Sequence, residues 1–233
     1  MAFCEKHPTG LLDCPEDLLS NDLIKEYFDS WAAGRALEFL VQRRGYNEEE
    51  LKAQHPKYLL PYEESTCADG SISHLVLADN AFPVLDRNPE IKTLLDVGCG
   101  TGLSGKPFIE RGYIVDGIDI SEKMVQRTRE KRYRKVFCGN IIEEAPKIQE
   151  KYDGIIAVLS LRYFCLDCFF PAINTVLKDK AVICATLDLD NGLDAFLRKL
   201  QEIGFTNQNI FADKAYDWSN TEFQNYVLAI RNA

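Results

Sequence analysis

The sequence predicts an α/β protein whose mostly parallel β-sheet carries helices on both faces. Three observations predict this fold. From Thr93 onward, short apolar runs alternate with helical patterns, which is typical of such a sheet. The first run passes into the glycine-rich stretch LLDVGCGTG at residues 94–102, which indicates a buried strand, a tight turn and a helix. The second run ends at an acid, Asp119, where the strand ends of an α/β sheet line a ligand crevice.

The individual elements follow from the pattern of apolar residues. Strands are expected at residues 93–97, 114–118, 135–138, 154–159, 181–187, 207–212 and 223–230. Helices are expected near 105–111, 121–131 and 168–177, and an amphipathic helix after Asn191 ends at Gly204. We therefore assign residues 91–233 to the α/β domain.

Residues 1–90 are expected to form an N-terminal helical cover on this domain, within one compact unit. The first 20 residues or so resemble an irregular arm. Apolar spacing predicts a helix that begins near Ser20 or Asn21, is interrupted or weakened at Gly34 and stops at Gly45. Further helices are expected over 47–55 and 73–85, with turn-like sequence at 66–71.

Composition limits the partners and the compartment. The formal net charge is −9, which disfavours binding to the polyanionic backbone of a nucleic acid. No apolar run reaches the roughly 18 residues of a membrane span, and Glu5 and Lys6 stand where a signal peptide would be apolar. Several of the eight cysteines lie in apolar runs, as free thiols do in a reducing compartment. We expect a cytoplasmic protein.

The spacing of the glycine loop distinguishes between cofactors. A dinucleotide-binding loop needs a third glycine at position 103, which is Leu103 here. The observed order, Asp96 followed by glycines at 98, 100 and 102, resembles motif I of class I S-adenosylmethionine-dependent methyltransferases. The resemblance implies a Rossmann-like fold of seven strands with an antiparallel last strand and an N-terminal lid. It also implies a loop against the methionine part of the cofactor, with Asp96 reaching the cofactor's amino end through water.

Acids and amides after the next strands extend the expected site to a nucleoside. Asp119 can accept hydrogen bonds from both ribose hydroxyls, although it also suits the cap of the following helix, and Asp116 is a poorer alternative. Asn140 and Ile141 stand where these methyltransferases often have an acid and an apolar residue for adenine; a plain Gly-Asn turn is the alternative.

A segment of the cover, YFDSWA at residues 27–32, resembles the YDxWA segment of the Williams-Beuren-region methyltransferase-like proteins. That resemblance implies that its aromatic residues close over the methionine end, while a core helix explains them equally well. The expected cofactor site thus comprises Asp96, Gly98, Cys99, Gly100, Thr101, Gly102, Asp119, Ile120, Met124, Asn140, Ile141, Leu159, Tyr27 and Trp31.

Methyl transfer can proceed by alignment and desolvation alone, so a dedicated base is not required. Candidates for acceptor contacts or for a base are Tyr163, His74 and Tyr62, with Arg162 and Asp190 as further polar groups, and a structural role stays open for each. The (Asn or Asp)-Pro-Pro-(Tyr or Phe) signature of adenine and glutamine N-methylating enzymes is absent after the fourth strand. That absence disfavours those substrates.

Two further motifs have simple structural explanations. Cys165 and Cys168 form a CxxC without a second pair at zinc spacing, so no metal is expected. The basic run over residues 123–135 is most simply the solvated face of a helix, although RNA would bind there if RNA were the substrate.

The sequence therefore predicts transfer of a methyl group from S-adenosylmethionine, leaving S-adenosylhomocysteine, to an oxygen, nitrogen or sulfur of a small molecule. Three alternatives stay open. They are a non-catalytic cofactor-binding or partner-binding module, a protein methyltransferase, and a nicotinamide-dependent oxidoreductase, which Leu103 disfavours. The sequence indicates neither the acceptor nor the oligomeric state.

Overall fold

The computed structural model describes residues 20–54, 56–68, 70–188, 192–214 and 223–232. The expected N-terminal arm up to residue 19, the expected helix end at His55 and the candidate Asp190 lie outside the described residues. Within the described part of the chain, no helix is long and apolar enough to cross a membrane.

One seven-stranded sheet organises the described residues, with the strand order β3-β2-β1-β4-β5-β7-β6. Strands β1 to β5 pair in parallel, whereas β7 lies antiparallel between β5 and β6. This confirms the expected mostly parallel sheet with an antiparallel last strand. The strands are β1 (Thr93–Val97), β2 (Ile114–Asp119), β3 (Val136–Cys138), β4 (Tyr152–Ala157), β5 (Leu177–Asp188), β6 (Asn207–Lys214) and β7 (Phe223–Arg231).

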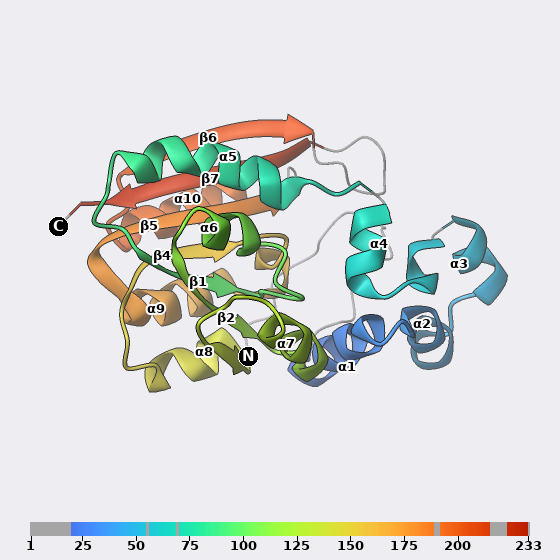
Figure 1. Cartoon of the computed structure of the whole chain (residues 1–233). Helices are drawn as coiled ribbons and strands as arrows, with labels where there is room; N and C mark the ends of the chain where they lie inside the picture. Colours follow the sequence, from blue (N-terminus) through green and yellow to red (C-terminus); the bar gives the residue numbers. More distant parts are fainter. Residues whose placement is uncertain (1–19, 55, 69, 189–191, 215–222, 233) are drawn as a thin grey trace.

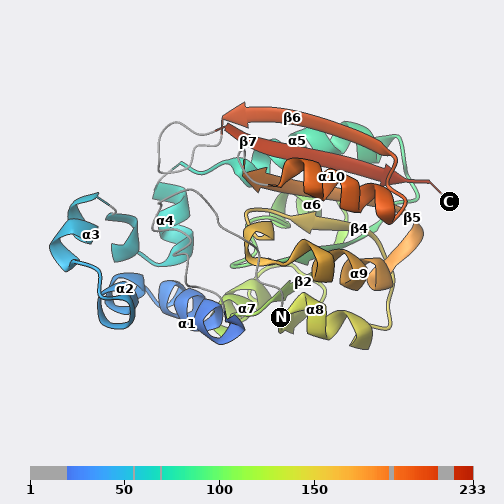
Figure 2. The same ribbon diagram turned by 180° about the vertical axis from the view of Figure 1, so that it is seen from behind.

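Helices cover both faces of the sheet. One face carries α5 (Ser73–Asp86), α6 (Lys106–Glu110) and α7 (Glu122–Arg129), as seen in Figure 1. The other carries α8 (Ile141–Glu144), α9 (Leu166–Val176) and α10 (Leu193–Glu202), which lie in front in Figure 2. Successive strand residues point to opposite faces. Leu94 therefore belongs to the apolar core beneath α5, and its neighbour Leu95 belongs to the core beneath α9.

Four N-terminal helices and a 3-10 turn form a separate lobe beside the sheet (Figure 1). We call α1 (Asn21–Ala32), α2 (Ala36–Arg44), α3 (Glu48–Gln54), η1 (Pro56–Leu59) and α4 (Tyr62–Ala68) the N-terminal lobe. The Ser20 hydroxyl caps α1 by accepting from the N–H of Leu23. Gly34, with a φ of +72°, separates α1 from α2. The lobe has its own core, rich in aromatic residues such as Tyr27, Trp31 and Tyr58.

Several local expectations differ from the structure. Strand β5 begins at Leu177 rather than at 181, so the preceding helix ends at Val176. Residues 66–68 were expected in a turn but belong to α4, where the Thr66 hydroxyl donates back to the carbonyl of Tyr62 at 2.8 Å. Strand β4 covers 152–157 rather than 154–159, because Leu159 has a φ of +56° and has left the strand. The short helix α8 was not expected; it begins where Asn140 caps the chain. Short segments of this kind carry too few residues for a readable period.

Candidate functional site

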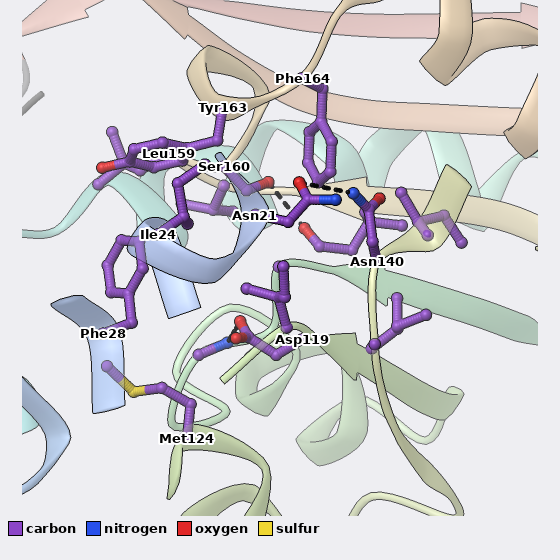
Figure 3. Close-up of a pocket in the computed structure, with 18 of the residues that line it drawn as sticks. Asn21, Ile24, Phe28, Asp119, Met124, Asn140, Leu159, Ser160, Tyr163 and Phe164 are labelled. Carbon is purple, nitrogen blue, oxygen red and sulfur yellow. Dashed lines mark hydrogen bonds between the residues drawn. The ribbon is translucent and has the colours of Figure 1, made fainter. Parts of the chain in front are cut away.

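The principal pocket lies at the carboxyl ends of the central parallel strands, and residues of the N-terminal lobe line its other side (Figure 3). This is where an open α/β sheet binds its ligands. Side chains of α1 and α4 therefore face loops that follow β1, β2, β3 and β4. The lining residues include Asn21, Ile24, Phe28, Tyr62, Gly98, Gly100, Asp119, Ile120, Met124, Asn140, Ile141, Leu159, Ser160, Tyr163 and Phe164.

The glycine loop after β1 forms the floor of the pocket. Gly98 has a φ of +71°, and a Cβ there would lie 2.4 Å from the Cβ of Ser160. The backbone N–H groups of Gly98 and Cys99 both donate to the carbonyl of Ile118 on the neighbouring strand. At Gly100, with a φ of +52°, a Cβ would meet only the Tyr62 ring at 3.7 Å. Glycine thus keeps open a surface that a ligand can approach closely.

Asp96 is a buried carboxylate beneath this loop. Its Oδ2 accepts from the Ser104 hydroxyl at 2.6 Å and from the Tyr133 hydroxyl at 2.5 Å. Its Oδ1 is buried and has no hydrogen-bond partner among the described residues. Burial raises the pKa of Asp96 to about 6. The unused oxygen is where an ammonium group or a bridging water would be stabilised.

Asp119 ends β2 and is half-buried at the pocket wall (Figure 3). Its Oδ2 accepts from the N–H of Gly100 and its Oδ1 from the N–H of Ser121, both at 2.9 Å. Burial raises the pKa of this carboxyl to about 6. Each carboxylate oxygen keeps a second lone pair, so the pair can accept from two vicinal hydroxyls of a ribose.

The alternatives weighed for Asp119 are resolved by its neighbours. Ser121, rather than Asp119, supplies the side-chain cap of α7 by accepting from the N–H of Met124. Asp116 is fully buried away from the pocket, where it accepts two hydrogen bonds from Arg134 and one from the Tyr152 hydroxyl at 2.8 Å. Asp116 is therefore a structural anchor, and Asp119 is the acid at the pocket.

Asn140 and Ile141 line the far end of the pocket. The Asn140 side chain caps α8, since its Oδ1 accepts from the N–H of Ile142 at 3.0 Å. Its Nδ2 donates to Oδ1 of Asn21, the first residue of α1, at 3.1 Å (Figure 3). The second lone pair of Oδ1 can still accept from an exocyclic amine. Ile141 is buried and presents the apolar surface that a flat ring would contact.

The aromatic residues of α1 are placed differently from the sequence-based expectation. Ile24 and Phe28 line the pocket, and the Phe28 ring meets Tyr163 edge-on at a centroid distance of 5.4 Å. Tyr27 and Trp31 are buried one layer behind, in the aromatic core of the N-terminal lobe. The helical period places Phe28 and Tyr27 on different faces, which only the docking of α1 could assign.

The loop after β4 carries backbone strain at the pocket. Leu159 is the one described non-glycine residue with a positive φ, +56°. Its N–H donates to the Thr186 hydroxyl at 2.7 Å, and the next residue, Ser160, donates its hydroxyl to the carbonyl of Val97. Such strain persists when surrounding contacts over-determine it, and it gathers at functional sites.

The remaining candidates fall into two groups. Tyr62 and Tyr163 line the principal pocket, whereas His74, Cys99 and Thr101 line a smaller adjoining hollow. Gly102 packs against Tyr133 and Lys131, and Arg162 is not among the lining residues of either.

The sequence placed Ser160 in the loop beside the expected methyl group, and it lines the pocket. It did not indicate Asn21, Phe28, Phe164, Ser104 or Tyr133 as site residues. The spacing of apolar residues identifies one face of a helix but does not show what that face packs against. Tyr133 lies within the basic run, where no pattern marks it as a site residue. Its hydroxyl accepts from the N–H of Gly105 at 2.9 Å while donating to Asp96, so it braces the loop.

Three of the seven basic residues in the run pair with acids of the same chain. Lys131 pairs with Glu63 of α4 at 2.9 Å, Arg134 with Asp116 at 2.6 Å, and Lys135 with Glu150 at 2.9 Å. No cluster of potential metal ligands occurs among the described residues. Cys165 and Cys168 are both free thiols.

These residues fit a nucleoside that carries an amino-acid tail. The pocket is lined by a carboxylate suited to ribose, by an amide and an apolar wall suited to adenine, and by an open glycine loop. Beneath that loop lies the buried Asp96 with one unsatisfied carboxylate oxygen. The fold and the site thus define a Rossmann-like nucleoside-binding protein.

Comparison with known proteins narrows this class. Residues 94–180 match the family described as a methyltransferase domain. Magnesium-protoporphyrin O-methyltransferase of Synechocystis is 26% identical over 140 residues, covering 58% of this chain and 54% of the relative. The 18S rRNA (guanine-N(7))-methyltransferase of Bos taurus is 27% identical over 128 residues, covering 48% and 46%. The chain spans about half the length of these curated relatives.

The fold is shared with solved methyltransferases. The structure of magnesium protoporphyrin IX methyltransferase from Synechocystis PCC 6803 with bound S-adenosylmethionine aligns with a TM-score of 0.58 at 17% identity. The alignment covers 91% of this chain and 97% of the other. The matched residues and the shared fold together support a class I S-adenosylmethionine-dependent methyltransferase.

Proposed function

We propose that this protein transfers a methyl group from S-adenosylmethionine to an oxygen, nitrogen or sulfur atom of a small molecule. One observation carries the proposal. The Asp119 carboxylate bonds the N–H of Gly100 at 2.9 Å, which joins the expected ribose-binding acid and the expected methionine loop into one continuous wall. The match of residues 94–180 to the methyltransferase-domain family supports the same cofactor.

The chain's contribution to such a reaction is alignment and exclusion of water. When bound, the cofactor supplies a methyl group that its sulfonium already activates. Asp119 and Asn140 would hold the nucleoside, Asp96 the amino end, and the loop from Gly98 to Gly102 the methionine part. Ile24, Phe28 and Tyr163 would shield the reacting atoms from solvent, since all three face the same pocket.

Three side chains are proposed to contact the acceptor. Tyr62 and Tyr163 are the phenols that line the principal pocket, and His74 lies in the adjoining hollow. Burial, together with the nearby charge of Lys106, lowers the pKa of His74, so its imidazole is neutral and able to accept a proton at physiological pH. The reaction as we propose it uses no metal.

The charge of the chain favours a small acceptor. The chain's net charge is −9, and the basic residues Lys131, Arg134 and Lys135 are already paired with acids. An unshielded basic surface is what nucleic-acid binding requires. One relative is named for a porphyrin substrate and another for an rRNA substrate, so the relatives do not agree on the class of acceptor. A small-molecule acceptor is our proposal. The free described cysteines support a cytoplasmic, reducing location.

Calorimetric titration with S-adenosylmethionine and S-adenosylhomocysteine tests cofactor binding. We expect both to bind the wild type, Asp119→Ala to bind at least about tenfold more weakly, since about 1.4 kcal/mol corresponds to tenfold, and Asp79→Ala to bind normally. Asp79 is exposed on α5, outside the pocket lining. Absence of heat with either ligand, or equal affinity of Asp119→Ala and wild type, contradicts the proposal.

Transfer of a labelled methyl group tests the acceptor class. The protein and methyl-labelled S-adenosylmethionine are incubated with the dialysable and the retained fractions of a cell extract. We expect label in products of the dialysable fraction. Label only in retained protein or RNA contradicts the small-molecule proposal, and cofactor binding without any labelled product supports a non-catalytic module instead.

A further inference from the structure

A second hollow adjoins the principal pocket on the side of α5. The two share Tyr62, Gly98, Gly100, Val158 and Leu159 in their walls. Beyond this shared wall, the second hollow is lined mainly by polar side chains, and hydroxyls are the commonest of them: Thr66, Ser71, Ser73, Thr101 and Ser104, with His74. Its position beside the glycine loop makes it continuous with the expected methionine end.

The N-terminus of α5 opens into this hollow. The helix runs for 14 residues, begins at Ser73 and has neither a side-chain cap nor an acidic residue in its first turn. It begins on the side that faces α4 and runs away from it (Figure 1). The first N–H groups of a helix have no partner within it and carry partial positive charge. Among the described residues, the first turn of α5 holds no acidic side chain to supply the negative charge that this end favours.

Two buried hydroxyls in the same hollow lack hydrogen-bond partners. Ser73 and Thr101 are each 1% exposed, and neither Oγ nor Oγ1 reaches a partner among the described residues. A buried hydroxyl left unpaired costs on the order of 1–3 kcal/mol. Ser73 comes from α5 and Thr101 from the glycine loop, so the two unpaired groups approach the hollow from separate elements.

The charge around the hollow specifies the ligand. No Asp, Glu, Lys or Arg side chain is among its described lining residues. Burial and the nearby charge of Lys106 lower the pKa of His74, which lines the hollow. Hydrogen-bond donors with no charged side chain beside them suit a ligand group that has a single negative charge and two oxygens. A phosphate dianion would call for a lining cation.

We propose that the N-terminus of α5, with the hydroxyls of Ser73 and Thr101, binds a carboxylate group. The proposal rests on the proposed function and names two sources of that group: the amino-acid end of the cofactor, or the methyl acceptor. The unpaired Oδ1 of Asp96 lies beneath the same loop as Thr101, which matches the ammonium and carboxylate of one amino acid.

Two ligands that differ in the amino-acid end distinguish the two sources of the carboxylate. S-adenosylhomocysteine carries the amino-acid end, whereas 5′-methylthioadenosine has the same nucleoside and thioether without it. By calorimetry, we expect Ser73→Ala and Thr101→Val each to weaken S-adenosylhomocysteine binding on the order of tenfold and to leave methylthioadenosine binding unchanged. Thr175→Val is the matched control, because that helical hydroxyl bonds the carbonyl of Ala172 on α9.

A second arm tests the acceptor as the source. If S-adenosylhomocysteine binding is unchanged, acetate is titrated into the complex with that ligand. Saturable acetate binding to the wild type that Ser73→Ala abolishes assigns the carboxylate to the acceptor. Unchanged binding of both ligands together with no difference in acetate binding overturns the proposal.

The thermal midpoint of the ligand-free variants provides a readout independent of cofactor binding. Removing a hydroxyl that has no partner leaves stability equal or slightly higher, so Ser73→Ala is expected not to lower the midpoint. A clearly lower midpoint indicates a structural hydroxyl and overturns the assignment. If the wild type binds neither nucleoside, the proposed function fails, while acetate titration of the ligand-free protein still tests the carboxylate site.

Discussion

The Asp29 carboxylate on α1 accepts a hydrogen bond from the Ser121 hydroxyl at 2.6 Å, at the start of α7. The same carboxylate oxygen accepts from the N–H of Lys123 at 3.1 Å. Burial alone would raise the pKa of Asp29, but these bonds and Lys25 bring it below its ordinary value. An acid of the N-terminal lobe thus stabilises the N-terminus of the helix that follows Asp119.

Replacement of Asp29 should weaken the docking of α1. We expect Asp29→Ala to lower the free energy of unfolding by about 1–2 kcal/mol, because α7 loses charge-assisted acceptors at its first turn. Lys25→Ala is the control and should cost less than about 0.5 kcal/mol, since it removes only a partly exposed i,i+4 ion pair. Urea unfolding measures both. Equal stabilities of the two variants would show that Asp29 does not hold the lobe.

A pair of glycine substitutions separates steric overlap from backbone strain. Gly98 and Gly112 both have positive φ, +71° and +96°, but only at Gly98 would a Cβ collide, 2.4 Å from Ser160. At Gly112 nothing lies within 4 Å. We expect Gly112→Ala to cost about 1–2 kcal/mol, and Gly98→Ala to cost at least about 1 kcal/mol more. Denaturant titration checks this. Similar losses would mean that Ser160 moves aside freely.

Tyr133→Phe removes one of the two hydroxyls that donate to buried Asp96. At pH 7.5 or so, where Asp96 is ionised, we expect a loss on the order of 1–3 kcal/mol. The loss should shrink below about pH 5, because protonated Asp96 needs less compensation; its pKa is already raised to about 6 by burial. Unfolding titrations at both pH values measure the difference, with Tyr113→Phe as the control. A pH-independent loss would point to packing and to the hydrogen bond from the N–H of Gly105, and not to Asp96.

Nucleoside binding should depend on pH through Asp119. Ribose hydroxyls donate to the ionised carboxylate, so the complex favours ionisation, and the pKa of the free site is raised to about 6 by burial. Affinity for 5′-methylthioadenosine is therefore full above that pH and falls as pH drops through it, by up to about tenfold per unit. Asp119→Asn should bind weakly with no such slope. This probe lacks the amino-acid end, so it does not report on Asp96. The same slope in both proteins would assign the titration to another group.

Much of the central sheet could be predicted because its signals are local. Leu94 and Leu95 belong to a continuous apolar run that only a strand covered on both faces would bury, and the glycines that follow identify a turn. Asp119 could be assigned because the ends of adjacent parallel strands meet at one edge. The sequence also indicated that Leu103 excludes a dinucleotide loop.

The short helices and the aromatic residues of α1 were harder to predict. Helix α8 has four residues and α4 has seven, too few for a hydrophobic period to identify them. The assignment of Tyr27 and Trp31 to the cofactor rested on a weak motif, and the structure places Phe28 at the pocket instead. A helical pattern shows which residues share a face but does not show which face meets the sheet.

By itself, the sequence determined the α/β sheet, the glycine loop and the acid at the end of β2, because neighbouring residues create those features. Only the tertiary structure decided how the N-terminal lobe closes the pocket. The contacts that close it, Asp29 to Ser121 and Asn21 to Asn140, join residues 92 and 119 positions apart. The carboxylate-binding hollow likewise needs the start of α5 and the glycine loop side by side. No local pattern encodes such a meeting, because it depends on how separately formed elements pack.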